Sequence, residues 1–329
     1  MEALIYIWFA IIGFCIVMYV ILDGFTLGTG IVMPRLNDHE RDLSMSVILP
    51  NWDGNQTWLV LGAACLYGAF PLAFSILLPA FYLPLVAMLI ALLFRGICFE
   101  FRLKAQNKKN WDQLFIVSSV LVAFIQGLVL GAFVQGVDKT PHEAGYNFMW
   151  LSTFSIFTGL AVIAGYSLLG STRLILKTEG SLRQKMQRQA KISAFLVILF
   201  MAAISIWTPF LSAHTYNRWF NNIDILYLAI FPLLAVFSFG LILYSIRIGD
   251  DRLPYWGTII MFLTGFAGLG YGTLPYLVPF KYTIAECAAP FSTLSFTIVG
   301  AAIMLPFLLC YTGYSYYIFR GKVREKLHY

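Results

Sequence analysis

Charged side chains are scarce in this chain. Asp, Glu, Lys and Arg make up 12% of its 329 residues, whereas a typical soluble domain contains about 25%. Hydrophobic residues account for 60% of the sequence, and the mean hydropathy is +0.78. This composition excludes an ordinary soluble protein and predicts a polytopic membrane protein.

Signatures of catalysis and of metal binding are missing as well. The five cysteines show no CxxC or CxxCH spacing, which argues against a metal cluster, covalently attached haem or a disulfide framework. P-loop, dinucleotide-binding, nucleophile-elbow and HExxH patterns are also missing. The histidines fall in predicted loops or in the tail, not inside spans where they could ligate haem; they are His39, His142, His214 and His328. We therefore predict that this chain alone has no catalytic residues and binds no metal or cofactor.

Nine segments are long and apolar enough to cross a bilayer as helices, which requires about 20 apolar residues each. The predicted fold is therefore all-α. The predicted spans are about Ala3–Val32, Thr57–Leu77, Ala80–Phe101, Leu114–Val137, Phe148–Leu176, Ile192–Leu211, Ile225–Ile246, Tyr255–Val278 and Pro290–Phe319. Glycine pairs at a spacing of four, such as Gly24 and Gly28, Gly127 and Gly131, or Gly268 and Gly272, are expected to allow close helix packing.

The basic residues give these spans an orientation. Most lysines and arginines fall in the odd-numbered loops and in the C-terminal tail, whereas the opposite side has only Lys139, Arg218 and Lys281. The positive-inside rule then predicts an N-terminus outside and a C-terminus in the cytoplasm. The net charge of +6 is thus a signal of topology, and we expect no nucleic-acid partner.

Asp23 is a carboxylate at or near membrane depth. It follows an apolar run from Ala3 to Leu22 that already suffices to cross. One interpretation is that Asp23 marks the cytoplasmic edge of the first span. The other is that it faces a partner helix and holds water for proton entry, because intramembrane carboxylates serve as proton relays.

Asp53 lies in a polar cluster at the entrance of the second span, and it also has two interpretations. Its carboxylate, with the neighbouring Asn51 and Asn55, could cap free backbone N–H groups and favour the helix dipole. Alternatively, Asp53 and Asn55 join Gln56 and Thr57 in holding ordered water within about one turn of helix.

Three further charges close the third span. Arg95 lies well inside apolar sequence; it could extend its charge toward the interface or pair with Asp23 or Asp53. Glu100 and Arg102 are two residues apart and point to different faces of a helix. We expect each of them to meet a neighbouring helix or lipid headgroups.

At these residues the chain resembles subunit II of the cytochrome bd-type quinol oxidases. The compact second half is similar to the shorter, cyanide-insensitive type. The motifs that carry the resemblance are Asp23-Gly24-Phe25-Thr26-Leu27-Gly28, Trp52-Asp53-Gly54-Asn55-Gln56-Thr57-Trp58-Leu59, Ala69-Phe70-Pro71, and Phe94-Arg95 through Phe99-Glu100-Phe101-Arg102.

The resemblance implies a multi-pass subunit of a respiratory complex in the bacterial inner (plasma) membrane. It implies two four-helix bundles, residues 1–140 and 141–285, followed by a final helix and basic cytoplasmic tail at 286–329. Haems b and d and the quinol-oxidising loop would belong to a partner, subunit I, in a heterodimer that small accessory subunits can join. Lipid and quinone are further expected partners. The complex would oxidise quinol and reduce dioxygen to water with cytoplasmic protons.

The resemblance also implies residue roles. By motif, the proton path would involve Asp23 and Asp53. From their positions beside these carboxylates, Asn55 and Thr57 are further candidates for the path, and Arg95, Glu100 and Arg102 are supporting charges. Many members carry a second acidic residue where this chain has Thr26. A hydroxyl can hold water but cannot store a proton at neutral pH, so the acidic set narrows to Asp23 and Asp53.

A proton-coupled transporter is the alternative, since intramembrane Asp and Arg also suit substrate translocation. It would require helices broken near the midplane in both halves. Here the conspicuous charges cluster at one side of one half, which favours the oxidase subunit.

Overall fold

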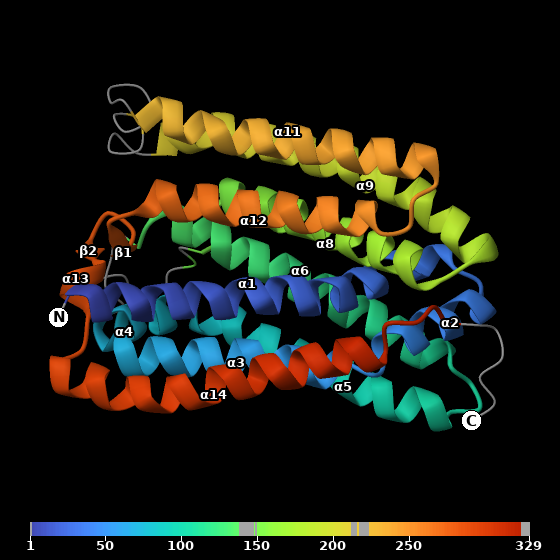
Figure 1. Ribbon diagram of the computed structural model, residues 1–329, viewed down its shortest axis with the longest axis horizontal. Coiled ribbons are helices and arrows are strands. Elements are labelled where there is room, and N and C mark those ends of the chain that lie inside the picture. The colour runs from blue at the N-terminus through green and yellow to red at the C-terminus, as the bar shows by residue number, and fades with distance from the viewer. Residues whose placement is uncertain (1, 138–147, 149, 212–215, 217–223, 324–329) are drawn as a thin grey trace.

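The computed structural model describes residues 2–137, 148, 150–211, 216 and 224–323. Long helices run side by side along the long axis of the molecule (Figure 1). They are α1 (Glu2–Val32), α3 (Trp52–Ala69), α5 (Tyr82–Lys104), α6 (Lys109–Gln135), α8 (Thr153–Lys177), α9 (Gly180–Trp207), α11 (Asp224–Ile248), α12 (Leu253–Thr273) and α14 (Phe291–Ile318).

Within the described residues, eight helical segments are long and apolar enough to span a membrane. They correspond to α1, α5, α6, α8, α9, α11, α12 and α14. The prediction of a polytopic, mainly helical membrane protein is therefore confirmed. The predicted span that is not among these eight segments is the second one, at about 57–77.

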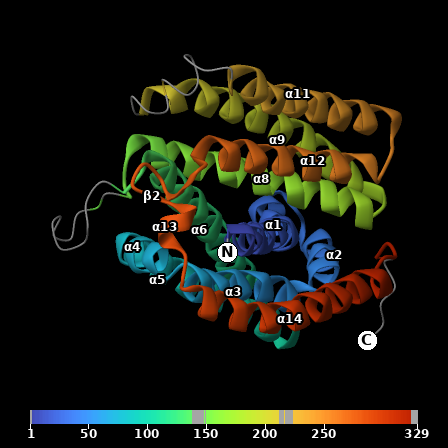
Figure 2. The same cartoon turned by 60° about the vertical axis from the view of Figure 1, so that its left-hand side comes forward.

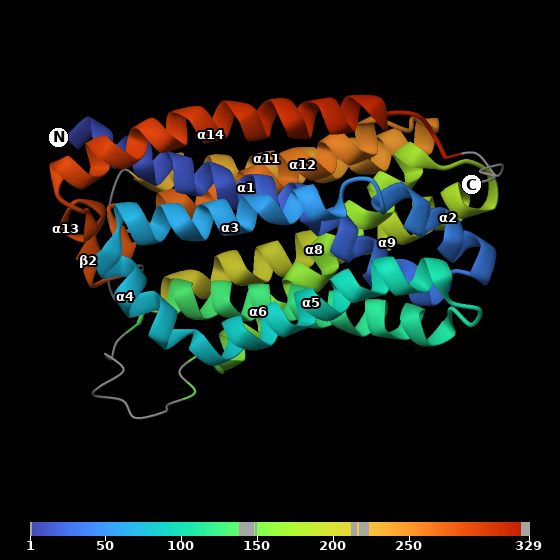
Figure 3. The same ribbon diagram turned by 90° about the horizontal axis from the view of Figure 1, so that it is seen from below.

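That second span is divided into two helices. α3 ends at Ala69, and a shorter helix, α4 (Pro71–Ala80), follows. Phe70 between them has φ −132° and ψ 63°. Pro71 has no N–H to donate and crowds the residue before it out of the helical conformation, so one unbroken helix cannot form. α3 nevertheless packs along α1 and α14 (Figure 3).

Two other predicted boundaries were wrong. α9 begins at Gly180, well before the expected start at Ile192, because the basic stretch after Lys177 is helical as well. α12 ends at Thr273, whereas the predicted span continued to Val278. The chain there forms an antiparallel hairpin of β1 (Tyr276–Val278) and β2 (Tyr282–Thr283), followed by α13 (Ile284–Cys287).

The centre of the bundle is the contact between α1 and α8 (Figure 2). A Cβ added at Gly28 would lie 1.8 Å from the backbone oxygen of Tyr166, so only glycine fits there. Gly127 of α6 is also close to α8, 2.5 Å from the Thr158 oxygen by the same construction. The predicted packing role is confirmed for these glycines but not for the third predicted pair, Gly268 and Gly272, because a Cβ at Gly272 would meet no atom within 4 Å. Helices before and after residue 140 share one buried core.

The two ends of the bundle differ in what they carry. The hairpin, α13 and α4 lie at the end where the chain begins (Figure 1). The opposite end holds the α5–α6 connection, the residues after α14, the short helix η1 (Met33–Arg35) and α2 (Asp38–Ile48). Another short helix, η2 (Thr208–Leu211), extends α9. Asn37 starts α2 with a capping box, in which its side chain and that of Glu40 accept each other's backbone N–H.

Candidate functional site

A fully buried ion pair joins α1 to α5. Asp23 and Arg95 both have side chains that are 0% exposed, and Arg95 Nη2 lies 2.9 Å from each Asp23 carboxylate oxygen. The structure thus selects one of the options open for Arg95: it pairs with Asp23 and does not reach the interface. For Asp23, the burial favours the interpretation in which the carboxylate faces a neighbouring helix.

This ion pair leaves several polar atoms without a hydrogen-bond partner. They are Arg95 Nε, Arg95 Nη1 and Asp23 Oδ2, the last of which has its ion-pair contact with Arg95 Nη2 but no hydrogen bond of good geometry. Buried polar groups of this kind are costly unless a water or another polar group satisfies them. The pair therefore presents two donors and one acceptor that a water or a further polar group would satisfy.

Asn55 connects the first turns of α3 to α1 and α14. Its side chain is 1% exposed, and its Nδ2 donates to the Leu22 carbonyl at 2.7 Å and to Thr26 Oγ1 at 3.5 Å. The Tyr316 hydroxyl of α14 donates to Asn55 Oδ1 at 3.0 Å. The hydroxyl of Thr26, which lies about one helical turn after Asp23 on α1, is thus part of a buried hydrogen-bond network.

Asp53 and Thr57 lie on another side of α3, where both side chains are exposed. They are one turn apart and form a stripe with Val60 and Ala64, which are also exposed. Asp53 falls in the first turn of α3, where a negative charge is favoured by the dipole. The capping interpretation is wrong for Asn51: it stands at the N-cap without a side-chain capping bond, and its Oδ1 accepts from Ser315 at 2.6 Å.

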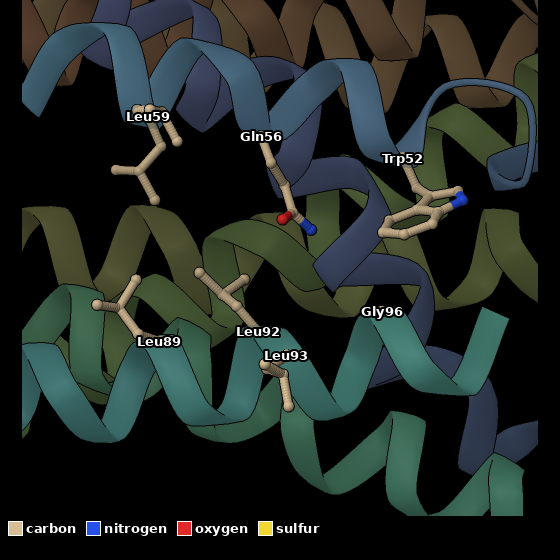
Figure 4. A pocket seen from close by; sticks show the side chains of 8 residues that line it. Trp52, Gln56, Leu59, Leu89, Leu92, Leu93 and Gly96 are labelled. Atoms are coloured by element: carbon tan, nitrogen blue, oxygen red, sulfur yellow. The ribbon is translucent and has the colours of Figure 1, made fainter. Parts of the chain in front are cut away.

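A cleft of about 340 Å³ opens between α3 and α5, beside these residues. Gln56 points into it from α3, and Trp52 lies over Gly96 of α5 (Figure 4). The Gln56 Nε2 atom is buried and has no hydrogen-bond partner. The remaining lining residues are apolar: Leu59, Val60, Leu89, Leu92 and Leu93.

The other two supporting charges do not join this site. Glu100 is exposed. Arg102 is 3% exposed and contacts two carboxylates on neighbouring helices, Asp112 of α6 at 2.5 Å and Asp42 of α2 at 2.8 Å. The expectation that Arg102 meets neighbouring helices is confirmed, and it places Arg102 in a separate ion network at the end of the bundle.

A row of hydrogen-bonded polar side chains leads from Asp23 toward α8, and the sequence did not reveal it. Tyr19, one turn before Asp23 on α1, interacts with its carboxylate. Gln126 of α6 donates to the Tyr19 hydroxyl at 2.7 Å and accepts from the Tyr166 hydroxyl of α8 at 2.5 Å. The available signal was Gln126, a polar residue that interrupts an apolar span.

The part of the chain that the structure describes was compared with the requirements of a metal site. This part contains no group of three or more His, Cys, Asp or Glu side chains that could hold a metal ion. His39 is exposed on α2, and His142, His214 and His328 lie outside the described residues. No chemical step is therefore assigned to a metal or haem in this chain.

Fold and site together define a helical, multi-pass membrane protein with a buried ion pair near the end that bears its basic loops. The sequence model of cytochrome bd terminal oxidase subunit II matches residues 4–319. The chain belongs to this family, so the resemblance in its motifs is confirmed. It is a subunit of a terminal quinol oxidase, an oxidoreductase complex, and a multi-pass protein of the inner membrane.

Relatives align along nearly the whole chain. Cytochrome bd-I ubiquinol oxidase subunit 2 of Escherichia coli K12 is 24% identical over 372 residues, covering 99% of this chain and 96% of that protein. Cytochrome bd ubiquinol oxidase subunit 2 of Bacillus subtilis is 27% identical over 342 residues, covering 99% and 98%. A chain of the bd oxidase structure from Geobacillus thermodenitrificans superposes with a TM-score of 0.75 at 16% identity, over 93% of this chain and 96% of that one. This superposition shows a shared fold.

Proposed function

We propose that this chain supports the delivery of cytoplasmic protons to a haem-bearing subunit I, in a heterodimer that oxidises quinol and reduces dioxygen to water. In this proposal haems b and d belong to subunit I, and subunit II ligates neither. Family membership favours this function over a proton-coupled transporter. The observation that carries the proton role is the buried Asp23–Arg95 pair with its unpaired polar atoms.

We infer that the chain crosses the membrane nine times, with its N-terminus outside and its C-terminus in the cytoplasm. The supporting observation is that α1 begins at one end of the bundle and α14 ends at the other (Figure 1), as an odd number of crossings would have it. α3, together with α4, would supply the crossing that the eight strongly apolar helices lack. The grouping into residues 1–140, 141–285 and 286–329 belongs to the same proposal.

The proton path would begin at the first turns of α3. Asp53 and Thr57 are exposed there and could receive protons from the cytoplasmic side. Gln56, with its unpaired amide, lies on the same turns. Water held by these groups and by the Asp23–Arg95 pair would form a hydrogen-bonded path, because buried polar groups without protein partners usually bind ordered water.

The same face of α3 is where we place subunit I. A carboxylate and a hydroxyl at Asp53 and Thr57, followed along the helix by the small Ala64, suit contact with protein better than contact with lipid tails. α14 also has few buried residues, Leu294 and Ala301 among those described. A partner on this side would cover both helices and receive the protons. Lipid, quinone and small accessory subunits remain further proposed partners.

The proton role is tested in the complete oxidase with Asp23→Asn and Asp53→Asn. Each should slow oxygen consumption while the haem content stays normal, because an amide cannot accept a proton. Asp38→Asn is the matched control, since Asp38 is exposed at the start of α2 with a weak ion pair to Arg41. Normal turnover of both variants in complexes with normal haem content would refute the proton role. Where Asp23→Asn does not assemble, Asp53→Asn decides.

The haem assignment has its own test. The chain expressed alone should show no stoichiometric haem absorption in the visible spectrum. A haem signal that disappears when a histidine of this chain is replaced would overturn the assignment of both haems to subunit I.

A further inference from the structure

Arg173 of α8 is a second buried arginine close to the site. It is 6% exposed, and its guanidinium carbon lies 4.9 Å from the ring centre of Phe25 and 5.2 Å from those of Tyr255 and Tyr316. These rings come from α1, α12 and α14. One cation therefore holds three other helices against α8.

The surroundings of Arg173 are unusual for a buried charge. Among the described residues no carboxylate forms an ion pair with it, and its Nε has no hydrogen-bond partner. A desolvated guanidinium is instead attracted to the negative faces of aromatic rings. Arg173 also forms a side-chain hydrogen bond with Tyr255. A neutral side chain of similar size would lack the attraction to the rings, so the charge contributes to the position of Tyr316.

Tyr316 links this aromatic cage to the first turns of α3. Its hydroxyl donates to Asn55 Oδ1 at 3.0 Å, and Asn55 Nδ2 donates to the Leu22 carbonyl at 2.7 Å. Leu22 directly precedes Asp23, and Phe25 follows two residues later on α1. The Phe25 and Tyr316 rings also meet edge to face, with their centres 6.4 Å apart.

We propose that Arg173 is a positioning residue for proton entry. By holding Tyr316 and Phe25, it fixes Asn55 of α3 and the turn of α1 that carries Asp23 in one relative position. This inference rests on the proposed proton role of the subunit. Arg173 itself transfers no proton; it sets the geometry of the groups that would.

Three variants of the complete oxidase test the inference. Arg173→Gln removes the charge, Arg173→Lys keeps a cation that can still contact aromatic rings, and Tyr316→Phe keeps the ring but removes the hydroxyl. Oxygen consumption at saturating quinol is measured from pH 6 to pH 8.5, together with the KM for quinol and the haem content. Arg183→Gln is the control, because Arg183 pairs with Asp251 and the Gly249 carbonyl away from the cage.

We expect Arg173→Gln and Tyr316→Phe to lower kcat roughly tenfold at high pH, a typical cost of losing a supporting contact at a functional site. The loss should shrink toward pH 6, because proton supply limits turnover most when protons are scarce. KM and haem content should not change. The double variant Arg173→Gln/Tyr316→Phe should be no slower than either single variant, since both residues act through Asn55. Arg173→Lys should keep much of the wild-type rate.

The outcomes separate this inference from the proposed function. Wild-type pH profiles for Arg173→Gln and Tyr316→Phe, alongside slow Asp23→Asn and Asp53→Asn variants, would overturn the role of Arg173 alone. A uniform loss at every pH would also overturn it. Wild-type profiles in all four variants would refute the proton role itself. If Arg173→Gln does not assemble, the profile of Tyr316→Phe decides.

Discussion

Two groups of charged side chains on α5 and its neighbours differ in how many carboxylates the buried arginine contacts. Arg95 and Arg102 are seven residues apart, about 10 Å along the helix axis. Arg95 has a single carboxylate partner, Asp23, and two of its nitrogens are unpaired. Arg102 shares its charge between Asp112 and Asp42, and in this network Asp42 Oδ1 and Arg41 Nε are likewise buried without a hydrogen-bond partner.

The partners of Arg102 have further partners of their own. Lys108 lies 2.9 Å from Asp42, and Arg41 lies 3.5 Å from Asp112. α2 is held on its other side by Glu40, whose carboxylate contacts Lys185 at 2.7 Å. This network ties α2, α5, α6 and α9 together at one end of the bundle. Loss of Arg102 would leave both of its carboxylates with another cation, Arg41 beside Asp112 and Lys108 beside Asp42.

The difference indicates what each group is for. In the Arg102 network the arginine has two carboxylates, and each of these has a second cation. Within the described residues, the Asp23–Arg95 pair has no second partner of either sign, and a single buried pair is expensive for the fold, which is why we assign a function to it. The predictions that follow separate the Asp23–Arg95 pair from the Arg102 network, beginning with the largest expected effect.

Arg95→Gln should have the largest effect. It leaves Asp23 as a buried carboxylate without a cation, and breaking a buried pair in this way typically costs about 3–5 kcal/mol. We expect a clearly lower Tm of the purified complex and reduced haem content. The double variant Asp23→Asn/Arg95→Gln should recover stability but not turnover. A wild-type Tm for Arg95→Gln would contradict the importance of this pair.

Gly28→Ala should come next. The added Cβ would overlap the Tyr166 backbone oxygen at 1.8 Å, so α1 and α8 must move apart, at the upper end of the about 1–3 kcal/mol typical for overpacking. We expect a lower Tm and slower oxygen consumption, because α1 carries Asp23. Gly300→Ala, where no atom lies within 4 Å of the added Cβ, is the control and should match the wild type.

Arg102→Gln should have a smaller effect. Loss of charged hydrogen bonds costs about 1.5–3 kcal/mol, and here Lys108 and Arg41 still neutralise the two carboxylates. We expect a modest decrease in Tm and normal oxygen consumption per assembled complex. A large loss of turnover at normal haem content would mean that the two groups of charges act as one.

Acid should have the smallest effect of these changes, and we expect it to destabilise the end of the bundle that carries α2. Burial raises the pKa of Glu40 and of Asp42, but the neighbouring cations outweigh it. Lys185 holds the pKa of Glu40 below its usual range, and Lys108 and Arg102 do the same for Asp42. Their stabilisation is therefore present at neutral pH and is lost as pH falls from about 4 through the lowered pKa values. Protection factors for amide hydrogen exchange in α2, which are corrected for the intrinsic pH dependence of exchange, should decrease between pH 5 and 3. In Lys185→Gln this decrease should be smaller, because part of the contact is already lost.

Local sequence was sufficient for most of the helices but not for their interruptions. Long apolar runs identified the spans, because a helix in lipid needs a fixed length of apolar residues. Hydropathy did not reveal the break at Phe70, where Pro71 stops the helix although every neighbouring side chain is apolar. It also missed the start of α9 among basic residues, because a helix that continues into water is no longer marked by hydropathy.

The candidate site was only partly predictable. Asp23, Asn55 and Arg95 were identified as polar residues near membrane depth, but the partner of Arg95 was left open between Asp23 and Asp53. Tyr19, Tyr166 and Tyr316 were missed, because aromatic residues are common in membrane helices and the sequence gives no sign of which hydroxyl meets a polar partner. A residue such as Gln126 inside a span is the stronger signal.

The sequence by itself determined the membrane class, the positions of most spans and the family, because these depend on composition and on short motifs read along the chain. Only the tertiary structure decided that Arg95 pairs with Asp23, that Asn55 faces inward while Asp53 and Thr57 face outward, and that Arg173 lies among three rings. Helix periodicity tells which residues share a face. Which faces meet depends on close contacts such as that between Gly28 and α8, and these exist only once the helices are packed.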